Sequence, residues 1–224
     1  MIKNVLFDLD GTIVDSSRCI YYVYEQLFEE LGVDRPKNMR RFIGPPTETA
    51  LSGYVDKEDL KKTSDRFREI YSTVDINATN DLYDGIKEAL IAVKNSGRKV
   101  YVATSKNEPV AKSLLNMKGI GHIFDGIYGS RYDYNPPRNQ KSKIIDALVE
   151  EEGLNKEECI LLGDTIYDVA GAKQSGVKVA IVNYGFGEIE DFIGEKIEFF
   201  ADTTSDILTK IEEYDEQNNK NGTV

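Results

Sequence analysis

Residues 5–12 read VLFDLDGT, and this stretch decides the fold. It begins with three apolar residues, a run too short for a helix. The run stops at two acids, Asp8 and Asp10, with Gly11 and Thr12 behind them. An apolar run of this length, bounded by turn residues, predicts a buried strand that ends in a turn. In a parallel sheet these acids would lie at the carboxyl end of the strand, where such sheets place their functional sites.

The chain beyond residue 82 repeats this pattern. Short apolar runs alternate with segments whose apolar residues recur at helical spacing. The alternation predicts an α/β fold, in which helices cover both faces of a parallel, Rossmann-like sheet. Further strands are expected at residues 100–103, 127–128, 159–162, 179–182 and 199–201.

Residues 15–80 have a different character. Apolar residues recur at helical spacing over residues 20–31 and again over residues 60–74, and no good strand pattern is present between about 15 and 80. We therefore expect a core domain formed by residues 1–14 and 81–224, with a helical domain, residues 15–80, inserted after the first strand.

The composition excludes several classes of protein. The 224 residues include 28 Lys and Arg against 39 Asp and Glu, a formal charge of −11, which argues against partners such as nucleic acid or an anionic membrane surface. No apolar run is long enough to cross a bilayer. Cys19 and Cys159 form no disulfide framework, so we expect a cytoplasmic protein. A single histidine, His122, excludes a multi-histidine metal site.

Polar residues also follow the other predicted strands. Thr104 and Ser105 come directly after the strand at 100–103, and Asp164 and Asp168 follow the strand at 159–162. Carboxylates that meet at one edge of a sheet repel each other unless a cation lies among them, and hard oxygen ligands favour Mg²⁺.

A phosphate would explain the remaining groups. Lys141 and Thr104 can hold phosphate oxygens, and backbone N–H groups at Gly11 and Thr12 can point at the same anion. A carboxylate held against phosphorus is a known nucleophile, so Asp8 is a candidate for that role.

The chain resembles the haloacid dehalogenase (HAD) superfamily of phosphatases. The resemblance rests on Asp-x-Asp-Gly-Thr after the first strand, Thr104 after the second, a downstream lysine, and Gly-Asp-x-x-x-Asp from residue 163. FIGPP at residues 42–46 and YGFG at residues 184–187 are similar to the phosphoglycolate phosphatase and 5′-nucleotidase-like branch. The resemblance implies a HAD-like core with a helical, C1-type cap over residues 15–80.

It also implies roles for individual residues. Asp8 would be the nucleophile, and Asp10 the general acid and then the general base. The Asp8 carboxylate, the Asp10 backbone carbonyl and the Asp164 carboxylate would bind Mg²⁺. Asp168 would support the metal through water or orient Lys141.

The phosphoryl group would be held by Thr104, Lys141 and the backbone N–H of Ser105. Many relatives carry this lysine in a Lys-Pro-x-Pro stretch, which the sequence lacks. Lys143 is therefore the alternative to Lys141, but it points to a different face of the helix, and we favour Lys141. We interpret Lys106 as a supporting or surface lysine.

Arg40 and Arg41 precede the Gly-Pro-Pro loop of the insertion and are candidates for binding a substrate carboxylate or a second phosphate. An exposed structural pair is the alternative.

We therefore expect an Mg²⁺-dependent phosphatase of small phosphorylated metabolites, a monomer or weak dimer. A phosphomutase or phosphotransferase of the same superfamily and a non-enzymatic phospho-acceptor domain are the alternatives. Phosphoglycolate, a nucleoside monophosphate, a sugar phosphate and pyrophosphate all stay open as substrates.

Overall fold

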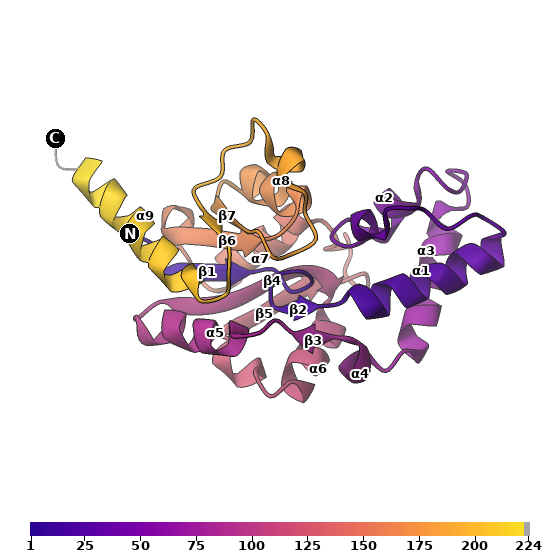
Figure 1. Ribbon diagram of the computed structural model, residues 1–224, viewed down its shortest axis with the longest axis horizontal. Helices are drawn as coiled ribbons and strands as arrows, with labels where there is room; N and C mark the ends of the chain where they lie inside the picture. Colours follow the sequence, from indigo (N-terminus) through magenta and orange to yellow (C-terminus); the bar gives the residue numbers. More distant parts are fainter. Residues whose placement is uncertain (222–224) are drawn as a thin grey trace.

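The computed structural model describes residues 1–221 and has a six-stranded parallel sheet at its centre (Figure 1). The strand order is β5-β4-β1-β6-β7-β8. The strands are β1 (Asn4–Phe7), β4 (Lys99–Asn107), β5 (Gly126–Ser130), β6 (Cys159–Gly163), β7 (Lys178–Val182) and β8 (Phe200–Ala201). The predicted α/β fold is confirmed, and each expected strand is present.

Helices cover both faces of this sheet because successive side chains of a strand point to opposite sides. On β1, Val5 and Phe7 pack in one hydrophobic cluster and Leu6 in the other. The first cluster receives α5 (Ile86–Asn95), α6 (Glu108–Met117) and α9 (Asp206–Asn221). The second receives α7 (Lys141–Glu151) and α8 (Ile166–Ser175). Short 3₁₀ turns complete the core: η2 (Gly121–Ile123), η3 (Lys156–Glu158) and η4 (Ile189–Phe192).

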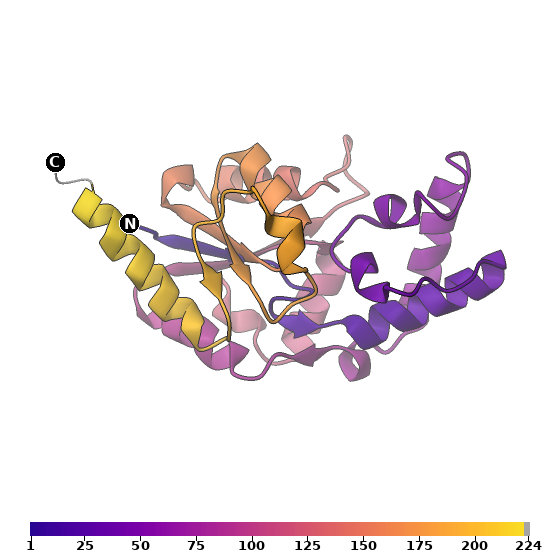
Figure 2. The same cartoon turned by 45° about the horizontal axis from the view of Figure 1, so that its top comes forward.

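The helical insertion stands beside the core and has its own hydrophobic cluster (Figures 1 and 2). Its elements are α1 (Ser17–Leu31), η1 (Met39–Phe42), α2 (Thr47–Leu51), α3 (Leu60–Thr73) and α4 (Ile76–Thr79). On α1, Val23, Tyr24 and Leu27 are buried at the spacing of one helical face, and Gly32 ends the helix with a φ of 65°. We call this insertion the cap.

A two-stranded ribbon joins the cap to the core. β2 (Val14–Asp15) pairs antiparallel with β3 (Asp81–Leu82), so the chain leaves and re-enters the core side by side. The sequence pattern missed this ribbon, because two-residue strands carry no periodicity. Within the described residues 1–221, no helix is both long and apolar enough to cross a membrane.

Candidate active site

The register of the sheet brings three predicted site residues to one edge. The last residue of β1 pairs with Val102 of β4 and with Leu162 of β6. Asp8 is the next residue, and its backbone N–H donates to the Leu162 carbonyl over 2.8 Å. Thr104 and Asp164 each lie two residues beyond the paired positions. All three therefore lie at the carboxyl edge of the sheet, as parallel pairing requires.

Glycines allow two loops to close around Asp164. Gly11 has a φ of 90°, and a Cβ added there would lie 2.0 Å from Oδ2 of Asp164. A Cβ on Gly185 would lie 2.3 Å from the Asp164 Cβ atom. The backbone N–H of Phe186 donates to Oδ2 of Asp164 over 2.7 Å. These contacts explain why both loops, far apart in sequence, carry glycine where they meet this acid.

The first loop uses its own N–H groups internally. Gly11 donates to the carbonyl of Val14 over 2.8 Å, and Thr12 donates to the carbonyl of Leu9 over 3.4 Å. The buried Thr12 also presents its carbonyl to the Tyr184 hydroxyl. The geometry therefore gives these two N–H groups a role in shaping the turn, in place of the expected contact with phosphate.

Lys141, the first residue of α7, lies between two buried carboxylates. Its Nζ atom is 2.7 Å from Oδ1 of Asp8 and 2.8 Å from Oδ1 of Asp168, and it donates to the Ala103 carbonyl over 3.2 Å. Only 6% of the Lys141 side chain is exposed. Lys143 is exposed. The helix geometry thus places Lys141, and not Lys143, at the edge of the sheet.

The lysine stem passes close to α8 at a glycine. A Cβ on Gly171 would lie 2.4 Å from Cγ of Lys141, so this position has room only for a residue without a side chain. Burial by itself lowers the pKa of Lys141, but Asp168 and Asp8 outweigh it and hold that pKa above its ordinary value. The ammonium group is therefore a permanent cation at neutral pH.

Asp168 is committed to contacts within the protein. Its Oδ2 atom accepts hydrogen bonds from the backbone N–H groups of Asp164 and Thr165, at 3.2 and 3.0 Å, and from the Thr165 hydroxyl. Its Oδ1 atom faces Lys141. This arrangement caps the N-terminus of α8 and fixes the orientation of Asp164 and Lys141 on either side of Asp168.

The acids carry more charge than Lys141 can balance. Asp8, Asp164 and Asp168 are buried, with one oxygen of each within 4.8 Å of the others. Burial, opposed by Lys141, raises the pKa of Asp8 to about 7. Burial, together with Asp168 and Asp8, also raises the pKa of Asp164 well above its ordinary value. Such a group of acids is stabilised either by protons or by a cation.

A hard divalent cation fits these residues. Oδ1 of Asp164 is buried and has no hydrogen-bond partner among the described residues, although its carboxylate is held in place through Oδ2. Asp8 lies beside it within the same cluster. The oxygens of Asp168 already contact N–H, hydroxyl and ammonium groups. This geometry suits Asp168 to orienting its neighbours better than to binding a metal ion directly. An all-oxygen set with room for water is the environment that Mg²⁺ prefers.

Lys106, which the sequence predicts to be a supporting or surface lysine, is buried beside Asp10. Its Nζ atom is 3.0 Å from Oδ1 of Asp10 and donates a hydrogen bond to the Tyr71 hydroxyl of the cap over 2.9 Å. Only 7% of its side chain is exposed. Strand alternation could not give the direction of Lys106, because the register of β4 against β5 is irregular between Ala103 and Asn107. Thr104 is buried, and it lines the same cavity as Ser105.

Arg40 and Arg41 point elsewhere. Arg40 donates to the carbonyl of Gly185 over 2.7 Å, and Arg41 pairs with Glu188 at 3.2 Å and with Asp191 at 3.6 Å. Neither arginine lines the cavity that lies between the cap and Asp8. Both connect η1 of the cap to the loop that contacts Asp164, so the geometry gives no support to substrate binding by these arginines.

A cavity of about 330 Å³ lies between cap and core, with Asp8 and Asp10 at its core end. Aromatic side chains form much of its wall: Tyr24, Phe42, Phe67, Tyr71 and Tyr132. The cations that line it are already paired. Lys106 faces Asp10, and Arg68 pairs with Glu48 at 3.1 Å and with Asp65 at 2.5 Å.

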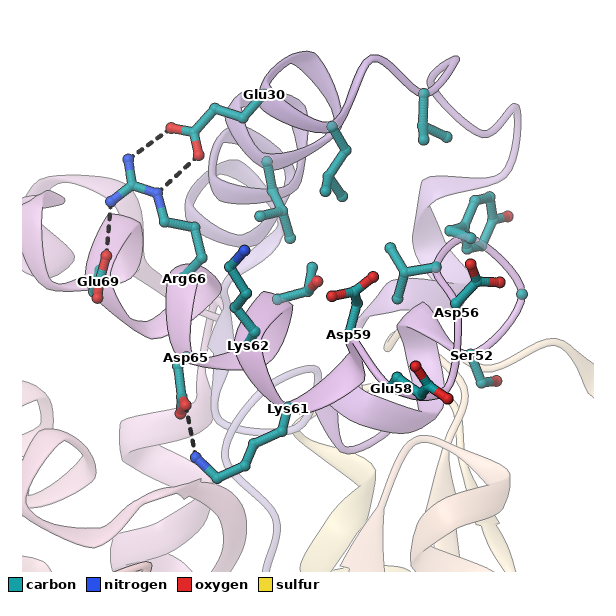
Figure 3. Close-up of a pocket in the computed structure, with 17 residues that line it drawn as sticks. Glu30, Ser52, Asp56, Glu58, Asp59, Lys61, Lys62, Asp65, Arg66 and Glu69 are labelled. Carbon is teal, nitrogen blue, oxygen red and sulfur yellow. Dashed lines mark hydrogen bonds and ion pairs between the residues drawn. The ribbon is translucent and has the colours of Figure 1, made fainter.

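A larger cavity, about 1180 Å³, is lined by cap residues alone (Figure 3). Its charged side chains mostly pair with each other. Arg66 contacts both Glu30 and Glu69, and Lys61 contacts Asp65. The buried acid cluster at the carboxyl edge of the sheet includes Asp8, which lines the smaller cavity, so this cavity is the candidate active site.

The comparison with protein families agrees with this site. Residues 5–182 match the model of haloacid dehalogenase-like hydrolases, so the chain belongs to that family. A 5′-nucleotidase of Pseudomonas aeruginosa is 34% identical over 84% of this chain and 86% of its own length. The tyrosine-protein kinase PtkA of Mycobacterium tuberculosis is 31% identical, and the alignment covers 84% of this chain and 64% of that protein.

A crystal structure of a predicted phosphatase from Clostridium acetobutylicum has a TM-score of 0.87 and 29% identity, covering 95% of this chain and 100% of that one. The chain is therefore an enzyme, a HAD-type phosphatase acting on small phosphorylated substrates. The resemblance stated from the motifs is confirmed.

Proposed function

We propose that the protein is an Mg²⁺-dependent phosphatase that hydrolyses a small phosphomonoester through an aspartyl-phosphate on Asp8. The observation that carries this proposal is the pairing of Asp8 with Lys141 beside the unpartnered Oδ1 of Asp164, at the end of a cavity. A buried carboxylate with a cation on one side and a metal ligand on the other is suited to attack a phosphorus atom.

The residues then have the following roles. A carboxylate oxygen of Asp8 attacks phosphorus in line, while the bond from phosphorus to the leaving oxygen breaks. Asp10 gives its proton to that oxygen. Water next attacks phosphorus, gives a proton to Asp10, and the bond from phosphorus to Asp8 breaks. Lys141 and Thr104 stabilise the equatorial oxygens of the phosphoryl group.

Mg²⁺ would be held by the Asp8 and Asp164 carboxylates and the Asp10 backbone carbonyl, where it would neutralise charge on a phosphoryl oxygen. The ion would also keep Asp8 ionised despite its burial. We assign residues 15–80 the role of a cap that excludes bulk water from the reacting groups.

The residues of the cavity wall indicate which class of substrate the site favours. Its aromatic surface and its already paired cations favour a leaving group with an apolar face over one that carries a second carboxylate. We therefore expect nucleoside monophosphates and aryl phosphates to have a higher kcat/KM than phosphoglycolate. Ranking kcat/KM across such a panel tests this preference.

Transfer to a second acceptor is the rival function, since one relative is named a kinase. Incubation with p-nitrophenyl phosphate and Mg²⁺ separates the two functions, because a phosphatase releases inorganic phosphate over many turnovers. Acid-quenched Asp10→Asn protein should retain phosphate on Asp8. A single turnover without phosphate release would contradict the proposal and would favour a phospho-acceptor role.

A further inference from the structure

Lys106 makes the contact that connects the cap to Asp10. Its Nζ atom lies 3.0 Å from Oδ1 of Asp10 on the core side. On the cap side it donates to the hydroxyl of Tyr71, on α3, over 2.9 Å, and it lies 5.0 Å from the centre of that ring. Two segments from different domains of the fold thus meet at one ammonium group.

The ion pair on the core side of this contact is sheltered from water. The side chains of Lys106 and Asp10 are 7% and 14% exposed, and the buried Oδ1 atom of Asp10 faces Lys106. Burial raises the pKa of Tyr71 to about 12, so its hydroxyl stays neutral and accepts the lysine hydrogen bond at working pH. A charge-assisted contact in such a place is stronger and more directional than one at the surface.

We propose that Lys106 is a positioning residue that makes the acid–base function of Asp10 depend on the docked cap, through the chain of contacts Tyr71–Lys106–Asp10. This inference rests on the proposed phosphatase function. With Oδ1 of Asp10 held by Lys106, Oδ2 is the oxygen left to exchange a proton with the leaving group. When α3 moves away, Lys106 loses its cap partner, and Asp10 loses a fixed orientation.

The coupling has a chemical signature. Protonation by Asp10 matters most when the leaving oxygen is basic, as in an alkyl phosphate, and least for p-nitrophenyl phosphate, whose leaving group departs as a stable anion. Loss of Lys106 should therefore lower kcat/KM selectively for alkyl phosphates. A lysine that only bound the phosphoryl group would affect both substrates equally.

The test compares kcat/KM for p-nitrophenyl phosphate and glycerol phosphate in Lys106→Met, Tyr71→Phe and Asp10→Asn. The ratio of the two values should rise about tenfold or more in Lys106→Met, less in Tyr71→Phe and most in Asp10→Asn. Lys143→Met and Tyr54→Phe, an exposed lysine and a cap tyrosine outside the cavity, should leave the ratio unchanged. Thermal unfolding of each variant confirms that it is folded.

A double variant completes the experiment. If Lys106 acts through Asp10, the Asp10→Asn/Lys106→Met protein should match Asp10→Asn alone toward glycerol phosphate. Additive losses, or equal losses for both substrates, would overturn the inference and assign Lys106 to phosphate binding. An unchanged ratio in Lys106→Met would overturn it too. Failure of the wild-type protein to hydrolyse either substrate would reject the phosphatase function itself, and the coupling with it.

Discussion

The two cavities of this protein differ in what their charges face. The smaller cavity, about 330 Å³, holds Asp8 and Asp10 at the carboxyl edge of the sheet, next to acids that have too few cations. The larger one, about 1180 Å³, has more charged residues, and several of them form pairs at the surface, such as Glu30 with Arg66 (Figure 3). Exposed pairs are screened by water and contribute little. Buried acids that lack balancing cations therefore identify the candidate active site, whereas the size of a cavity does not.

The largest expected effect comes from removing the nucleophile in the smaller cavity. Asp8→Asn should reduce kcat by at least about 10⁴-fold, since no other group can form the phosphoenzyme. Asp59→Asn is the matched control, because it changes an exposed acid of the larger cavity in the same way. Steady-state kinetics with p-nitrophenyl phosphate measure both. Near-normal activity in Asp8→Asn would show that the smaller cavity is not the active site.

Lys141 provides the second test. Lys141→Ala should lower kcat about 10²- to 10³-fold, because it removes a fixed cation from the transferring phosphoryl group. It should also destabilise the metal-free protein by about 3 kcal/mol, since Asp8 and Asp168 lose their buried partner. Lys143→Ala, on the exposed face of α7, should change neither quantity. Kinetics and urea unfolding of the pair check this, and equal effects would contradict the assignment.

Metal and pH test the unbalanced charge directly. Folding raises the pKa of Asp8 to about 7 and raises that of Asp164. The metal-free fold thus binds protons more tightly than the unfolded chain, and the stability that these acids contribute is lost as pH rises toward and past 7. Mg²⁺ competes with these protons, so it should raise Tm by about 5 °C at pH 8 and by less at pH 5.5.

Asp164→Asn is the control for this measurement. It should abolish most of the Mg²⁺ response and make the metal-free protein more stable at pH 8, because it removes a buried carboxylate that lacks a partner for Oδ1. Differential scanning calorimetry with and without Mg²⁺ gives both values. A full Mg²⁺ response in this variant would place the ion elsewhere.

The smallest effect is expected in the larger cavity. Arg66→Ala breaks exposed pairs with Glu30 and Glu69, so kcat, KM and the Mg²⁺ response should stay within about twofold of wild type. A substantial fall in kcat/KM would show that the larger cavity communicates with the active site.

Much of the site was predictable because local patterns determine it. The run before Asp8 predicts a strand, and the same pattern before Thr104 and Asp164 predicts two more. Parallel pairing then brings these residues to one edge without further information. The preference for Lys141 over Lys143 rested on the family resemblance together with helix geometry, which places the two lysines on different faces. The fold and the family are confirmed, whereas the roles of these residues stay predictions until the variants are measured.

The sequence by itself determined the strands of the central sheet, the helical insertion and the residues at the strand ends, because each depends on periodicity and turn chemistry within a few neighbours. Only the tertiary structure decided the directions of Arg40, Lys106 and Tyr71. These depend on how the cap packs against the core, and Lys106 and Tyr71, 35 residues apart, meet only there. No local pattern encodes a contact between the cap and the core, since its energy comes from surfaces that come together only in the folded protein.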